Sequence, residues 1–200
     1  MNNSKAGCLV KIEGEGVYVD SKGRKHSIEG IGSLPDEINL QSIKVEGSFS
    51  FEEISCDKIK VEGECSGNTV TAKNISIEGT IEVDSVTVED TFKLEGKAEI
   101  KLLDAKEIVM ETRGGEIGEI RCDKIKIFHD EDSERRKNRS RVRIKTIDAD
   151  TVNLENCEVD TIRCKDAIIG SNCAIGKLFV AGECEISADS KVDETIKGAV

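Results

Sequence analysis

Short pairs of apolar residues, each pair separated by one polar residue, recur along almost the whole chain. One cycle consists of Ile75/Ile77, Ile81/Val83 and Val86/Val88, and Phe92/Leu94 begins the next. Alternation with a period of two indicates half-buried β-strands, because successive side chains of a strand point to opposite faces. Three such pairs in every 16 or 17 residues predict a triangular coil with three short strands per turn.

An aliphatic residue followed by Glu and Gly marks successive cycles. The triplets are Ile12-Glu13-Gly14, Ile28-Glu29-Gly30, Val45-Glu46-Gly47, Val61-Glu62-Gly63, Ile77-Glu78-Gly79 and Leu94-Glu95-Gly96. A period this short is typical of a solenoid, in which each repeat buries its apolar face only by stacking on its neighbours. Glycine at the corner of a turn supplies backbone angles that other residues resist.

The first strand position can be followed from Val10 to Cys184, which corresponds to about ten turns. Parallel strands ~4.8 Å apart would then build a rod on the order of 50 Å long. We predict an all-β fold, a single-stranded parallel β-helix, over residues 10–192. Residues 1–9 and 193–200 are expected to be tails, and residues 129–141 a charged loop insertion.

Composition narrows the function classes. The formal net charge of −11 disfavours general nucleic-acid binding, which needs a basic face to displace counterions from phosphates. No run approaches the ~20 apolar residues of a membrane span, and the first residues lack the apolar segment of a signal peptide. These features favour a cytoplasmic protein.

Seven of the eight cysteines fall at inward positions, where Cys acts as a small hydrophobic residue; they are Cys56, Cys65, Cys122, Cys157, Cys164, Cys173 and Cys184. No CxxC pair occurs, so we expect no structural metal site. Cys157 and Cys173 are expected to stack on adjacent turns at a separation open to a disulfide, although a reducing cytoplasm keeps such pairs as thiols.

The remaining polar pattern offers little for catalysis or cofactor binding. An outward column of Glu residues could form a cation ladder, but a neighbouring Lys column makes screening between Glu and Lys the simpler interpretation. The sequence pattern offers the two histidines, His26 and His129, no second catalytic residue with which either could act as a general acid or base. We therefore expect a protein without cofactor, metal or enzymatic activity.

The charged insertion is a candidate contact site. It is acidic first and basic afterwards, and its cations are Arg135, Arg136, Lys137, Arg139 and Arg141. As a projecting loop it could dock on anionic lipid headgroups at the inner face of the membrane or on an acidic partner. A solvated loop of mixed charge that binds no partner explains the composition equally well.

The last turns are a candidate self-association site. The alternation places Ile168 and Phe179 outward, beside inward Leu178, Val180 and Ile186. An open solenoid end exposes unpaired strand edges and apolar core, and no amphipathic helix follows to cover it. We expect the chain to associate with itself there.

Two kinds of turn, Ile-Lys-Val-Glu-Gly and Ile-Ser-Ile-Glu-Gly, together with the later segment 177–183, resemble the bactofilins over residues 28–192. Bactofilins are polymer-forming bacterial cytoskeletal proteins. The resemblance implies a right-handed coil, end-to-end polymerisation without nucleotide, often at the membrane, and a scaffold role in cell shape or motility. The charged insertion, the absence of Pro-rich tails and the early start of the coil depart from the common form.

A second resemblance is local. Ile169-Gly170, Ile175-Gly176 and Ala181-Gly182 recur every six residues, as in the hexapeptide repeat of left-handed β-helix acyltransferases. Three hexads are few, and no His-bearing loop follows them. An acyltransferase remains the alternative function, since fold alone does not confer chemistry.

Overall fold

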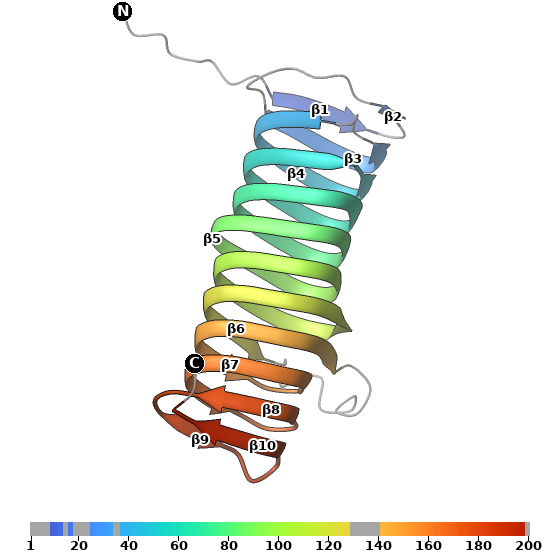
Figure 1. Ribbon diagram of the computed structural model, residues 1–200. Coiled ribbons are helices and arrows are strands. Elements are labelled where there is room, and N and C mark those ends of the chain that lie inside the picture. The colour runs from blue at the N-terminus through green and yellow to red at the C-terminus, as the bar shows by residue number, and fades with distance from the viewer. Residues whose placement is uncertain (1–8, 14–15, 18–24, 34–36, 129–140, 199–200) are drawn as a thin grey trace, which may run out of the picture.

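The protein is a rod of stacked turns, one parallel β-solenoid (Figure 1). The computed structural model describes residues 9–13, 16–17, 25–33, 37–128 and 141–198, with side chains described from Ser42 onward. It contains about nine turns, slightly fewer than the ten expected. The predicted all-β parallel coil is thus confirmed.

The strands follow one another along the axis of the rod. They are β1 (Leu9–Glu13), β2 (Gly16–Val17), β3 (Lys25–Ser33), β4 (Glu37–Ser50), β5 (Glu53–Phe128), β6 (Val142–Leu154), β7 (Cys157–Ile169), β8 (Ala174–Val180), β9 (Cys184–Ile186) and β10 (Lys191–Lys197). The longest, β5, bends around several corners without interruption, and the strand pairs are parallel. Each residue therefore lies over its counterpart one turn earlier.

The coil extends past the expected boundary at residue 192. Strand β10 continues to Lys197, in parallel register with β8, so most of the expected tail at 193–200 is part of the solenoid. The sequence signal fades there because Thr195 and Lys197 occupy the positions that stack on the inward-facing Leu178 and Val180. Polar residues at inward positions remove the alternation on which the prediction was based.

The predicted inward positions form one continuous aliphatic core. From Ile43 to Val180 nearly all of them are buried, including both phenylalanines of the Phe49/Phe51 pair and Phe92. Phe179, predicted to point outward, is half-buried, as is Phe128, and each has a cation over its ring. The remaining aromatic residue, Tyr18, lies outside the described residues.

A column of glycines sets the spacing at one corner. Gly47, Gly63, Gly79 and Gly96 all have positive φ, between 127° and 141°. A Cβ added to Gly79 would lie 1.9 Å from the carbonyl oxygen of Gly63, and one added to Gly96 would lie 1.9 Å from that of Gly79. Each turn thus rests its backbone directly on the next, which explains the Gly of the repeated triplet.

One turn departs from this arrangement. Where the next corner glycine would be expected, the chain has Thr112, followed by Gly114 and Gly115 with φ of 105° and 123°. Thr112 is 1% exposed, and its hydroxyl has no hydrogen-bond partner among the described residues. An unpartnered buried hydroxyl loses its hydration without compensation, so this residue destabilises the fold locally.

We predict that Gly79→Ala lowers the free energy of unfolding by at least ~3 kcal/mol, because the new Cβ meets a backbone carbonyl and φ is unfavourable for alanine. The neighbouring exposed Glu78→Ala is the matched control and should change it by less than ~0.5 kcal/mol. Chemical denaturation of both variants measures the difference. Equal losses would contradict the stacked-glycine geometry.

We also predict that Thr112→Val raises the free energy of unfolding by about 1 kcal/mol, since it replaces an unsatisfied hydroxyl by a methyl group of similar size. Val86, which is fully buried, gives the reverse control: Val86→Thr should lower stability by roughly 1–3 kcal/mol. Thermal and denaturant unfolding report both. A destabilised Thr112→Val protein would show that the hydroxyl has a partner in solution.

Candidate interaction sites

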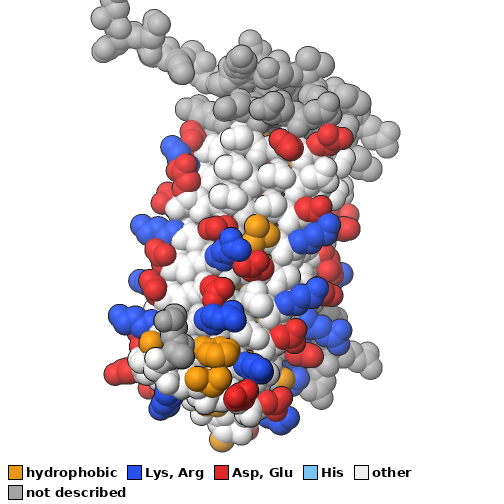
Figure 2. Space-filling model, in the orientation of Figure 1, with side chains coloured by type: hydrophobic (Ala, Val, Ile, Leu, Met, Phe, Trp, Pro, Cys, Tyr) orange, Lys and Arg blue, Asp and Glu red, His pale blue; other side chains and the backbone are white. Residues whose placement is uncertain are grey.

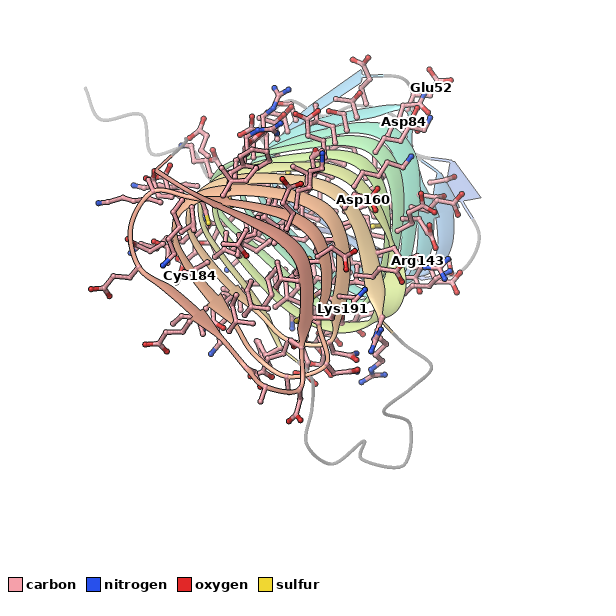
Figure 3. The ribbon with its side chains drawn as sticks, turned by 60° about the horizontal axis from the view of Figure 1, so that its bottom comes forward. Glu52, Asp84, Arg143, Asp160, Cys184 and Lys191 are labelled. Atoms are coloured by element: carbon pink, nitrogen blue, oxygen red, sulfur yellow. The ribbon has the colours of Figure 1, made fainter. Side chains whose placement is uncertain are left out.

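The C-terminal end of the rod is the first candidate site. Strand β9 pairs with β7, and β10 pairs with β8, and within the described residues no strand pairs with their outer edges. Figure 3 turns this end toward the viewer and labels Cys184 and Lys191 on it. Unpaired backbone N–H and C=O groups at such an edge are a template for another strand.

The structure divides the predicted self-association residues into two groups. Leu178 and Val180 are fully buried, because β10 continues the coil over them, so the expectation that they offer contact surface was wrong. Ile168 and Ile186 are 45% and 43% exposed, but Ile168 faces outward from the side of the rod, so of the two only Ile186 lies at the open end. Ile186 was expected to face inward, and it is exposed because within the described chain no further turn covers β9.

Phe179 lies on the side of the rod. Its ring is half-buried, with the guanidinium of Arg163 5.4 Å from the ring centroid, and Ile196 is its partner on the neighbouring strand. A cation over an aromatic face is attracted by the ring quadrupole. Phe179 therefore already has contacts within the chain and does not face the open end.

The surface of the open end is mixed in character. Its last inward positions carry Cys184 and Ile186 on β9, and Val192, Thr195 and Lys197 on β10. Cys184 and Val192 are partly buried against the core, whereas Thr195 and Lys197 are exposed. Lysine on an edge strand opposes indiscriminate strand pairing, so the apolar part of the end is limited to the β9 side and Val192.

The charged insertion, residues 129–141, is the second candidate site. Arg135, Arg136, Lys137 and Arg139 lie outside the described residues. Arg141 lies within them, and its guanidinium donates a hydrogen bond to the side-chain oxygen of Asn172. The Asn172 amide in turn donates to Oδ1 of Asn156 at 2.5 Å. Arg141 is thus fastened to the body of the rod rather than projecting from it.

Arg141 also lines a shallow polar groove of about 540 Å³, together with Lys97, Glu99, Gly115, Glu116, Arg143 and Glu158. Its charges compensate one another: Lys97 pairs with Glu99 at 2.9 Å and Arg143 with Glu158 at 3.6 Å. A neighbouring groove contains the Lys101–Asp84 pair at 2.6 Å. Because positive and negative side chains alternate in these grooves, the grooves lack the potential of one sign that would concentrate a charged substrate.

Acidic and basic side chains alternate over the rod surface, and most of the hydrophobic side chains on the visible face gather toward its C-terminal part (Figure 2). Glu46 and Glu62 stack in register, as the sequence pattern predicted. Each pairs with the lysine two positions earlier, Lys60 with Glu62 at 2.6 Å and Lys44 with Glu46. The Lys60 ammonium lowers the pKa of Glu62 by hydrogen bonding and charge, so the screening operates within a strand.

In the described part of the chain, no three His, Cys, Asp or Glu side chains come together in a group that could hold a metal ion. Within the same residues, no helix is long and apolar enough to cross a membrane. Comparison with protein-family models, curated proteins and solved structures found no match to the chain.

Proposed function

We propose that this chain is a structural scaffold of the bactofilin type, whose solenoids associate through their ends and support cell shape or motility machinery. The open C-terminal end carries the proposal: β9 and β10 have no strand on their outer edges among the described residues, and Ile186 is 43% exposed at an inward position. A second copy stacked there would extend the same hydrogen-bond ladder and bury that side chain.

The physical gain from such a joint is moderate. Burial stabilises a contact by roughly 25 cal/mol per Å² of apolar surface, so Ile186 alone would contribute on the order of 1 kcal/mol. Backbone pairing along β9 and β10 adds direction and register. Exposed Lys197 and Thr195 limit the apolar area, which favours a joint specified by strand pairing over a large hydrophobic interface.

The same proposal places the protein in the cytoplasm, without cofactor or nucleic acid. The cations of its charged insertion, residues 129–141, could hold the scaffold at the inner face of the membrane, where anionic lipids attract Arg and Lys. A net charge of −11 keeps the rods apart along their sides. Both features suit particles that join end to end.

The alternative, a hexapeptide-type acyltransferase, has weaker support. Outside the β5–β6 pairs, which span the insertion, paired positions are 15 to 17 residues apart, as in Val142↔Cys157, Ile43↔Ile59 and Ile175↔Val192. Three hexapeptides would give 18 residues per turn. The described grooves are shallow and lined by paired charges, and neither histidine side chain is among those described.

Sedimentation and electron microscopy of two matched variants test the proposal. Ile186→Lys changes an exposed isoleucine at the open end, and Ile168→Lys changes an equally exposed isoleucine on the side of the rod. We expect the wild-type protein and Ile168→Lys to form end-to-end assemblies, and Ile186→Lys to shift at least ~5-fold toward monomer, as a loss of about 1 kcal/mol implies.

Circular dichroism shows whether each variant keeps its β-structure. Wild-type protein that stays monomeric at all concentrations would overturn the proposal, and so would assemblies that Ile186→Lys leaves intact. A discrete trimer that binds an acyl donor would favour the acyltransferase instead.

A further inference from the structure

Cys157 and Cys173 occupy the same position in two adjacent turns. Cys157 begins β7, Cys173 immediately precedes β8, and the residues that follow them, Glu158 and Ala174, are register partners. Neighbouring parallel strands are ~4.8 Å apart, which lies within the Cα separation that a disulfide spans. Both thiols are buried, with exposures of 0% and 3%.

The two sulfurs lie in one small polar environment. Sγ of Cys157 donates a hydrogen bond to the carbonyl of Glu155 at 3.0 Å, and Sγ of Cys173 reaches back one turn to the carbonyl of Leu154 at 3.4 Å. The sulfurs therefore contact carbonyls of consecutive residues. The register stacks Cys173 on Cys157, and hydrogen bonding from the side chain and backbone of Cys157 acts on the Cys173 thiol and lowers its pKa.

This contact separates Cys173 chemically from the other described cysteines. The hydrogen bond from Cys157 lowers the pKa of Cys173 to about 7, against the opposing effect of burial. Burial instead raises the pKa of Cys56, Cys65 and Cys122 to about 12. The thiolate is the reactive form of cysteine, so Cys173 is the one poised to react near neutral pH.

Access to Cys173 is controlled by the last turn. The Cys173 amide donates to the hydroxyl of Ser190 at 2.8 Å, and the amide of Lys191 donates to the Cys173 carbonyl at 2.9 Å. The Ser190 hydroxyl itself donates to the carbonyl of Gly170. Segments at the end of a folded unit open with smaller free energies than its core, so we expect release of this turn to expose Cys173 while the rest of the rod stays folded.

We propose that Cys157 and Cys173 form a redox-active thiol pair that hydrogen peroxide converts into a disulfide joining two adjacent turns. The Cys173 thiolate attacks one peroxide oxygen, the O–O bond breaks, and Cys173 sulfenic acid and hydroxide result; the hydroxide becomes water with the proton that the Cys173 thiol released on ionising. The Cys157 thiol then attacks the Cys173 sulfur, the S–O bond breaks, and the departing hydroxide leaves as water with the Cys157 proton. Two thiols are oxidised by two electrons and one peroxide is reduced to two waters.

The disulfide would close a loop of one whole turn next to the end of the rod. A cross-link of this kind stabilises mainly by restricting the unfolded chain. It would hold the last full turns together and reduce opening at the C-terminal end. The inference does not depend on the proposed scaffold function, since it concerns contacts within one chain.

Peptide mapping by mass spectrometry tests the pair in the full chain. The protein is treated with hydrogen peroxide at neutral pH, free thiols are blocked with N-ethylmaleimide, and the digest is analysed without reduction. We expect a peptide linking Cys157 to Cys173 and a melting temperature that rises on oxidation and returns with dithiothreitol. Cys157→Ala should give no linked peptide, and Cys173 in this variant should react more slowly with peroxide, because it loses the hydrogen bond that lowers its pKa.

Cys164→Ala is the matched control, because Cys164 is equally buried but stacks on Ala149 and Val180 instead of another cysteine. It should form the linked peptide at the wild-type rate. Wild-type protein without that link, or with links spread evenly among the cysteines, would overturn the proposal. The Ile186→Lys protein should form the disulfide whether or not it assembles, so a failed scaffold function and a failed redox pair are distinguishable.

Discussion

The backbone hydrogen-bond ladder that runs along the rod is the interaction on which the rest of this structure depends. Because the strands are parallel and in register, every residue stacks on the residue at the same position one turn earlier, as Val45 does on Ile28 and beneath Val61. Similar side chains therefore stack on one another in columns that run along the rod. Within each column, the packing or the charge interactions between neighbouring side chains must be favourable over its whole length.

The columns differ in how stacking affects stability. Stacking stabilises the aliphatic columns, since their side chains bury apolar surface and have no polar groups that need a hydrogen bond. The corner column needs Gly63 and Gly79, whose backbones lie too close together for any Cβ. The Glu column would repel itself, and lysines two residues away compensate it, as Lys60 does for Glu62. Asn156 and Asn172, both with positive φ, pair their amides at another corner.

The sequence was informative wherever a column is long, and less so where a column begins, ends or changes. Alternation and the Glu-Gly triplets were enough to predict the coil, its core and the stacking of Cys157 on Cys173. Strand β10 was missed because Thr195 and Lys197 stand at inward positions. No local pattern could have indicated the contact of Arg141 with Asn172, which are 31 residues apart, because it depends on how many residues separate successive turns at that corner.

The same ladder explains why the C-terminal end is the chemically distinctive part of the rod. In the middle, each turn is covered on both sides, so buried thiols such as Cys65 are held in the neutral form by burial alone. Within the described chain, the turn formed by β9 and β10 is covered on one side only, and its side chains contact the core on that side and are open to solvent or a partner on the other. Three features of this end follow. Ile186 is an apolar residue that is left exposed, and Lys197 places a charge over the core. The thiols of Cys157 and Cys173 are separated from solvent by a single turn. The properties that could regulate or extend the rod are therefore concentrated where the periodic constraint is relaxed.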